Sequence, residues 1–185
     1  MKKIISYTLS LAVFLSYLFS LVLIISCAQP VPKAENATAR GGKILSGTNK
    51  GEDYRFGRDQ EAALALAFST AFVNKNYAFL SQEHFADTLF FYPEKGLDRL
   101  TFDIQTAIEL LQAMHAPYDS IRRSVYDVIP VVPSYDESLT IVMFPFTETR
   151  YKKDGSVEKY RFFERHYIRD GKINGVRKWS QEEIP

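Results

Sequence analysis

The sequence predicts an α+β fold in which helices precede an antiparallel sheet. Two segments, 59–72 and 101–115, repeat apolar residues at the period of a helix. After residue 125 the pattern changes to alternating apolar and polar residues with glycine-containing turns, which is typical of antiparallel strands. Because short connections make consecutive strands neighbours, we expect the C-terminal strands to form one meander.

The helices and the first strand are expected in order along the chain. Asp59 is a suitable N-cap for the first helix, which should end at Asn74–Asn76. Residues 77–83 are expected to form a second, short helix, and Thr88–Tyr92 a strand that Pro93 stops. With the segment 101–115, about three helices should therefore come before the meander.

The meander should have three or four strands. Pro130 and Pro133 lack backbone donors, so the first of these strands should be bent or lie at an edge. Gly155 and Gly171 mark the turns of two hairpins. The expected strands span residues 125–132, 139–149, 157–168 and 173–180.

The chain begins with the features of an export signal over residues 1–26. A basic start precedes an almost entirely apolar run over residues 4–25. The four residues that end at Cys27 (IISC) resemble the lipobox of bacterial lipoproteins, which implies a lipid on this cysteine. The alternative is an uncleaved transmembrane anchor, since about 20 apolar residues can span a bilayer. Both hypotheses tether the protein to a membrane.

The residues after Cys27 predict where the protein is held. By the sorting rule that goes with the lipobox, Ala28 in place of an aspartate implies the outer membrane, on its periplasmic side. Residues 27–58 are rich in small and polar residues and proline, so we expect a flexible tether. Residues 59–185 should then form one folded domain in the cell envelope.

Charge and motif content exclude several kinds of partner. The chain has 23 basic and 22 acidic side chains, and cleavage of the signal would remove two lysines, so nucleic acid is not an expected partner. The histidines His84, His115 and His166 lack a metal-ligand spacing, and Cys27 is the only cysteine. No glycine-rich phosphate loop or nucleophile elbow is present. We therefore expect neither a metal nor a cofactor.

The element order and two short motifs resemble the nuclear transport factor two-like superfamily, which includes SnoaL-like polyketide cyclases and ketosteroid isomerases. The stretch Phe85-Ala86-Asp87, ahead of a strand that ends in proline, is similar to the family's FADD…P stretch. Residues 169–173 (RDGKI) are similar to the turn between its last two strands. The resemblance implies a cone: a strongly curved antiparallel sheet packed on about three N-terminal helices, with a cavity between them.

The resemblance also implies which residues line the cavity. In the ketosteroid isomerases an aspartate precedes the proline that ends the first strand, but this chain has Tyr92 there. The position of a tyrosine on the first helix corresponds to Phe68, so neither isomerase group is present at its matching position. We expect the cavity to be lined by Phe68, Tyr92, Tyr160, Phe162, Glu164 and His166.

One face of the long strand 157–168 offers candidate catalytic residues. Side chains alternate along a strand, and the family's parity at the turn glycine implies that Glu164 and His166 face the cavity. His166 could act as a base that Glu164 orients, with Asp87 or Tyr92 as a second polar group. The alternative is a buried histidine and glutamate that only satisfy each other.

The opposite face of the same strand offers an interaction surface. Phe163 and Tyr167 lie among arginines there, and aromatic residues and arginine are enriched at the centres of interfaces. This pattern predicts a homodimer through the sheet, or another protein partner. The alternative is a half-exposed sheet surface covered by arginine stems.

The sequence therefore predicts a lipid-anchored cell-envelope protein without a cofactor. Its domain is expected to bind a small apolar or amphipathic ligand, or a protein partner, without catalysis. The alternative is a SnoaL-like acid–base enzyme of the cyclase, isomerase or hydrolase type that uses a polar group in the cavity.

Overall fold

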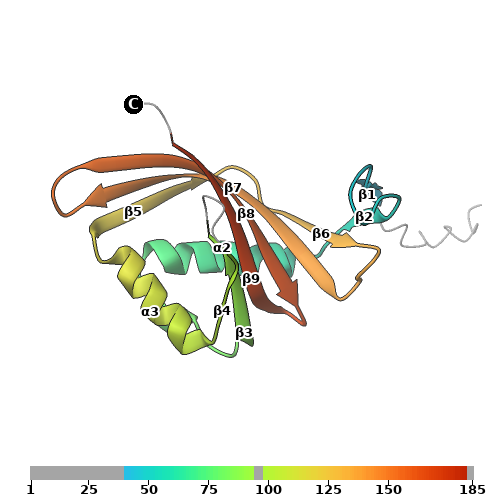
Figure 1. Cartoon of the computed structure of the whole chain (residues 1–185), viewed down its shortest axis with the longest axis horizontal. Helices are drawn as coiled ribbons and strands as arrows, with labels where there is room; N and C mark the ends of the chain where they lie inside the picture. Colours follow the sequence, from blue (N-terminus) through green and yellow to red (C-terminus); the bar gives the residue numbers. More distant parts are fainter. Residues whose placement is uncertain (1–39, 94–97, 183–185) are drawn as a thin grey trace, which may run out of the picture. The chain divides into compact units, whose positions relative to one another are not determined.

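The computed structural model of the chain describes residues 40–93 and 98–182 (Figure 1). Thr38–Pro185 is one compact unit, and it includes every described helix and strand. The predicted export signal and Cys27 lie outside the described residues. Within the described ranges, no helix is long and apolar enough to cross a membrane.

Nine strands in the described residues form one sheet. Its order is β1-β2-β6-β7-β8-β9-β3-β4, and β5 pairs with β7 off this path. The strands are β1 (Arg40–Lys43), β2 (Asp53–Phe56), β3 (Phe85–Tyr92), β4 (Leu100–Phe102), β5 (Tyr118–Val125), β6 (Ile129–Pro133), β7 (Leu139–Lys152), β8 (Val157–Arg169) and β9 (Lys172–Glu182).

The sheet is mixed, which corrects the expectation of a purely antiparallel one. The strands β6 to β9 form the antiparallel meander that the alternating sequence predicts. The strand β3 then pairs in parallel with β9. Parallel pairing needs a long connection, and the whole chain between the two strands provides it.

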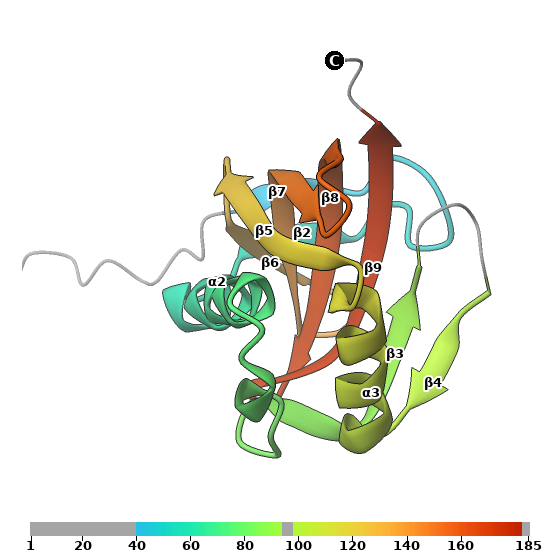
Figure 2. The same cartoon turned by 90° about the vertical axis from the view of Figure 1, so that its left-hand side faces the viewer.

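Both α-helices in the described residues lie on one face of the sheet (Figure 2). They are α2 (Asp59–Val73) and α3 (Ile104–His115). The second predicted helix is only a 3-10 turn, η1 (Tyr77–Phe79), so the expectation of about three helices is wrong there. Two residues limit this turn. Lys75, which precedes it, has a left-handed backbone (φ 53), so a helix cannot start earlier. Leu80, which follows it, has a non-helical backbone and a side chain buried in the core.

The helix α3 starts three residues later than the apolar period predicts. Asp103 caps it, because its carboxylate accepts a hydrogen bond from the Thr106 amide at 2.8 Å. The preceding residues form β4, which pairs with β3. The apolar period therefore predicted that α3 is a helix, and the Asp103 cap determines its first residue.

Two other boundaries differ from expectation. The strand predicted over 125–132 corresponds to β6, which begins four residues later, and the preceding residues form a further strand, β5; both strands pair with β7. Part of the predicted tether, 27–58, also joins the sheet, because β2 pairs with β6. Main-chain pairing, which needs few large apolar side chains, accounts for strands in a segment whose composition predicts a tether.

The main core lies between the helices and the middle of the sheet. Phe144, Phe146 and Val142 on β7 are fully buried, and Ala65 of α2 packs in the same cluster. A second, smaller cluster around Ile141 lies on the other side of β7. Burial on both faces explains why β7 reads as a nearly continuous apolar run.

Candidate functional site

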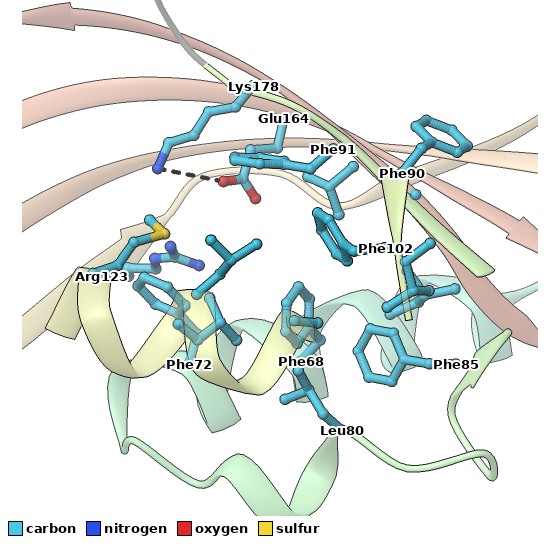
Figure 3. Close-up of a pocket in the computed structure, with 18 residues that line it drawn as sticks. Phe68, Phe72, Leu80, Phe85, Phe90, Phe91, Phe102, Arg123, Glu164 and Lys178 are labelled. Carbon is cyan, nitrogen blue, oxygen red and sulfur yellow. Dashed lines mark ion pairs between the residues drawn. The ribbon is translucent and has the colours of Figure 1, made fainter. Parts of the chain in front are cut away.

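A cavity of about 100 Å³ lies between the helices and the sheet (Figure 3). Its walls come from α2, the segment after η1, β3, β4, α3 and β9. The apolar residues and glycine that line it are Phe68, Phe72, Leu80, Phe85, Leu89, Phe90, Phe91, Phe102, Ala107, Leu110, Leu111, Met114, Ile173, Gly175 and Val176.

Aromatic packing shapes this apolar wall. The ring of Phe68 lies edge-on to Phe85 with centroids 5.2 Å apart, and it lies 6.4 Å from the ring of Phe79. The ring of Phe90 covers Gly175, where a Cβ atom would lie 2.2 Å from the ring. Gly175 is therefore required by the close approach of Phe90 rather than by backbone conformation.

Three charged side chains complete the lining: Arg123 of β5, Glu164 of β8 and Lys178 of β9. Figure 3 shows them together on one side of the cavity, away from the rings of Phe68 and Phe85. The site is therefore an apolar chamber with a charged region at one side.

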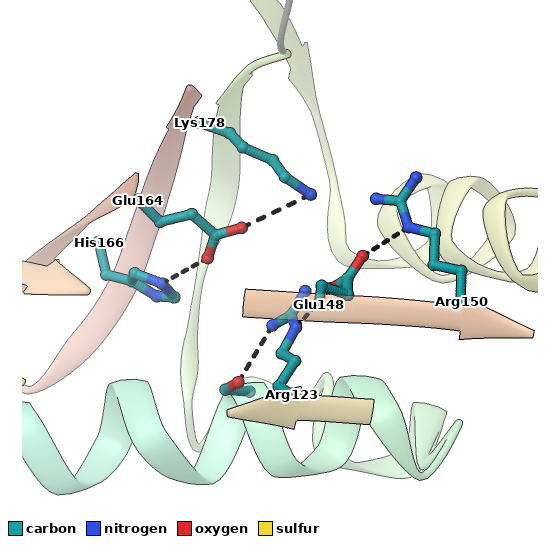
Figure 4. A network of polar contacts seen from close by, with 7 residues as sticks. Arg123, Glu148, Arg150, Glu164, His166 and Lys178 are labelled. Carbon is teal, nitrogen blue, oxygen red and sulfur yellow. Dashed lines mark hydrogen bonds and ion pairs between the residues drawn. The ribbon is translucent and has the colours of Figure 1, made fainter. Parts of the chain in front are cut away.

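These charges belong to a buried network (Figure 4). Glu164 contacts His166 at 3.0 Å through one oxygen, and Lys178 lies 3.8 Å from the other. Glu148, which is completely buried, accepts from Arg123 and from Arg150 at 2.6 Å each. The Glu148 carboxylate thus holds two guanidinium groups in fixed positions.

The network keeps its carboxylates ionised. Burial alone would raise the pKa of Glu164, but the hydrogen bond from His166 and the charges of Arg123 and Lys178 lower it to about 2. The pKa of Glu148 is also lowered, because its arginine partners and Lys178 outweigh burial. Both carboxylates are therefore negatively charged at neutral pH.

The ionised state of Glu164 determines the direction of its hydrogen bond with His166. An ionised carboxylate only accepts hydrogen bonds, so Nε2 of His166 donates to it. Nδ1 of the same ring is buried without a hydrogen-bond partner, and the ring packs between Phe68 and Phe144. His166 is thus held firmly, with one nitrogen unused.

Lys178 has the least satisfied charge in the network. Its ammonium lies over the ring of Phe162, 3.8 Å from the centroid, and 3.8 Å from the nearest oxygen of Glu164. That distance is too long for a hydrogen bond. Burial lowers the pKa of Lys178 from 10.5, and Glu164 and Glu148 only partly offset this effect.

A second buried histidine lies next to this network. His115 at the end of α3 contacts the Tyr77 hydroxyl through Nδ1 at 3.0 Å, and its Nε2 is buried without a partner. Burial and the charges of Lys75 and Arg123 lower its pKa to about 4. His115 is therefore neutral at pH 7, although nothing in the sequence pattern singles it out beyond its residue type.

The structure brings together only part of the predicted site. Phe68 and Glu164 line the cavity, and His166 lies directly behind Glu164. Phe162 lies under Lys178, and Tyr160 packs near Arg150. Tyr160, Phe162 and His166, which were expected in the cavity, are not among the residues that line it, whereas their network partners Glu164 and Lys178 are.

The two other predicted polar groups lie elsewhere. Asp87 is exposed and accepts a hydrogen bond from Gln82 at 3.2 Å. Tyr92 packs under the guanidinium of Arg177, 4.5 Å from the ring centroid. Neither lines the cavity, so neither is positioned to assist Glu164.

The predicted interaction residues are on the opposite face of β8. Phe163 packs against Trp179, with centroids 5.7 Å apart, and Tyr167 packs against Phe90 at 5.2 Å. Both are half-buried, whereas Trp179 is 41% exposed. The homodimer through this surface remains a prediction.

Sequence reasoning missed Arg123, Glu148 and Lys178. A signal existed for Glu148, which follows Phe144 and Phe146 at the strand spacing of two and so lies on the same buried face of β7. Lys178 had no such signal, because a β-bulge between Tyr167 and Ile168 shifts the register and makes Lys178 the partner of Glu164. In the described part of the chain, no group of three or more histidine, cysteine or acidic side chains is arranged to hold a metal ion.

Comparison with solved structures identifies the fold. An LEH-like epoxide hydrolase from M. tuberculosis has a TM-score of 0.52 and 15% identity, over 66% of this chain and 84% of that one. A nuclear transport factor two-like protein from Anabaena variabilis has a TM-score of 0.52 and 16% identity, over 68% and 92%. A proposed polyketide cyclase from Acidithiobacillus ferrooxidans has a TM-score of 0.52 and 12% identity, over 66% and 88%.

These similarities show that the chain has the nuclear transport factor two-like fold, as the sequence motifs predict. No protein-family model matches the sequence, and no curated protein does. The same fold supports unrelated functions, so the activity must be argued from the cavity itself.

Proposed function

We propose that the cavity binds a small, mainly apolar molecule and holds one polar group of that molecule against Glu164, Lys178 and Arg123. The observation that carries this proposal is the composition of the lining: three charged side chains at one side of an otherwise apolar chamber. Ligand sites typically combine apolar walls with a few fixed polar groups in this way. The apolar wall provides affinity, and the charged region orients the ligand.

The proposal can be tested by filling the cavity with a larger side chain. Ala107 of α3 is buried and lines the cavity, whereas Ala113 of the same helix is exposed. We expect Ala107→Leu to weaken binding of octan-1-ol to the full-length chain at least tenfold, measured from the ligand-induced rise in Tm. The matched control, Ala113→Leu, should leave the affinity unchanged. Equal affinities in the two variants would contradict the proposal.

A second candidate function is acid–base catalysis in the same cavity. It is favoured by the contact of Glu164 with His166 beside the chamber, and by the names of two proteins of this fold, an epoxide hydrolase and a proposed polyketide cyclase. Lys178 and Arg123 could stabilise negative charge on a substrate oxygen. The low pKa of Glu164 makes it a weak base, which is why binding is the first proposal.

If the cavity is catalytic, a substitution of Glu164 should lower a reaction rate, whereas a binding protein has no such rate to lose. With styrene oxide as the probe, an enzyme should hydrolyse the epoxide, and Glu164→Gln should lower the rate by about a hundredfold or more. The same variant should still bind octan-1-ol, because the amide keeps the size of the side chain. If the wild type hydrolyses styrene oxide no faster than Glu164→Gln does, acid–base catalysis on epoxides is contradicted.

We also propose that a lipid on Cys27 holds the protein at the cell envelope, on the periplasmic side of the outer membrane. This proposal rests on the apolar run and the IISC sequence that ends it. Mass spectrometry of the mature N-terminus should find a diacylated cysteine. An unmodified Cys27 preceded by the intact apolar run would support a transmembrane anchor instead.

A further inference from the structure

The buried network contains three basic side chains and only two carboxylates. Its cations are Arg123, Arg150 and Lys178, and its carboxylates are Glu148 and Glu164. None of these five side chains is more than 11% exposed. Glu158, whose pKa is lowered in part by Arg150, is already paired with Lys152.

A buried charge without a partner is costly, and burial lowers the pKa of Lys178, so an anion beside its ammonium would stabilise the charged form. His166 cannot supply a negative charge, since a histidine is either neutral or positive. His115 also adds no negative charge, for the same reason. No carboxylate of the network thus offers Lys178 an acceptor within hydrogen-bond distance.

The position of Lys178 indicates where that anion would bind. Its ammonium has three donors but only a 3.8 Å contact with Glu164, whose other oxygen is occupied by His166. Lys178 lines the cavity, and so does Arg123, whose guanidinium is hydrogen-bonded to Glu148 and Ser69. An acceptor group in the cavity would reach Lys178 and lie close to the charge of Arg123.

We propose that the ligand of the cavity is a small amphipathic acid whose single carboxylate binds Lys178, with Arg123 close by. This inference rests on the proposed function, and it adds the charge of the ligand. One carboxylate would pair with the Lys178 ammonium and give it the hydrogen-bond acceptor that Glu164, 3.8 Å away, does not. A group with two negative charges is disfavoured, because Glu164 borders the same space.

The test compares three ligands that share one chain length: octanoate, octan-1-ol and octylammonium. Against the full-length protein at pH 7.5, we expect octanoate to bind at least tenfold more tightly than octan-1-ol, and octylammonium to bind most weakly. Each Kd is obtained from the ligand-induced rise in Tm. This comparison uses the wild type, so it does not depend on how any variant folds.

A variant then assigns the effect to one side chain. Lys178→Met removes the charge at nearly constant volume and should weaken octanoate at least tenfold while leaving octan-1-ol within threefold of the wild-type value. Lys153→Met makes the same change on an exposed turn and is the control, with no expected effect on either ligand.

The outcomes separate the two proposals. If octanoate and octan-1-ol bind equally well, the carboxylate inference is wrong, although the cavity still binds an apolar molecule. If octylammonium binds most tightly, the inference is also wrong, and Glu164 rather than Lys178 selects the ligand. If none of the three raises the Tm, the proposed function fails together with the inference.

Discussion

The two faces of β8 differ in which kinds of side chain they bury. On the inner face, Glu164 and His166 are buried and contact each other in a network that borders the cavity. On the outer face, Phe163 and Tyr167 are half-buried and pack against Trp179 and Phe90. One strand thus buries two ionisable side chains on its inner face and leaves two large aromatic rings partly in solvent on its outer face, which hydrophobic burial alone would not give.

This difference indicates which face is constrained by function. Replacing a buried ionic network with apolar side chains often leaves stability unchanged or increases it, so stability alone does not explain Glu164 and its partners. Half-exposed aromatic rings under arginines, in contrast, are common on stable sheet surfaces. The inner face is therefore where we expect ligand chemistry, and variants of the two faces should behave differently.

The largest difference is expected when one charge is removed from each face. Glu164→Ala leaves Lys178 buried without the carboxylate that it contacts, which should lower the free energy of unfolding by about 3–5 kcal/mol. Arg165→Ala on the outer face should cost about 1 kcal/mol, mainly through lost packing on Trp179. Urea unfolding of both variants measures the comparison, and similar losses would contradict it.

A smaller effect is expected where β9 meets β3. Gly175 lies under the ring of Phe90, so Gly175→Ala must displace that ring and should lower the free energy of unfolding by about 1–3 kcal/mol. Adding Phe90→Leu removes the obstructing ring. The double variant should then show a loss smaller than the sum of the two single losses, as a double-mutant cycle would measure. Simple additivity would argue against the close contact.

The buried histidine beside the network should make stability depend on pH. His115 has a pKa of about 4 in the folded protein and about 6.5 when unfolded, so the unfolded chain binds more protons between these values. The free energy of unfolding should therefore decrease as the pH falls from 6.5 to 4. His115→Gln should flatten this part of the profile, measured by urea unfolding at several pH values. His84→Gln is the matched control, and a profile unchanged by His115→Gln would refute the assignment.

The smallest effect on stability is expected on the outer face. If copies of the chain associate through it, Phe163→Ser should weaken that association while lowering the free energy of unfolding by about 1 kcal/mol or less. Sedimentation velocity over a range of concentrations measures the association. A wild type that is monomeric at all concentrations would contradict association through the outer face of β8.

The inner face of β8 shows how far the sequence could predict the site. Alternation along the strand correctly predicted that Glu164 and His166 are buried together, because a strand has a fixed period of two. Lys178 could not be predicted from the same alternation, since the bulge beside Ile168 moves the pairing by one residue and brings Lys178 opposite Glu164. A bulge of this kind leaves no clear pattern in the sequence.

Arg123 was missed for a different reason. The sequence predicted a strand beginning at residue 125, whereas β5 begins at Tyr118 and pairs Arg123 with Glu148 across the sheet. Polar residues make the segment 118–124 unlike a typical strand, and only its contact with β7 makes it one. Pairing between distant segments is the information that local patterns lack.

The central claim is that the apolar chamber with a charged side is a ligand site. Native mass spectrometry of the full-length chain, purified from its own cells, tests this most directly. The account predicts a bound small molecule with an acidic group, present on the wild type and on Ala113→Leu but absent from Ala107→Leu. A wild type without any bound molecule, whose Tm is also unchanged by octanoate and octan-1-ol, would contradict the claim.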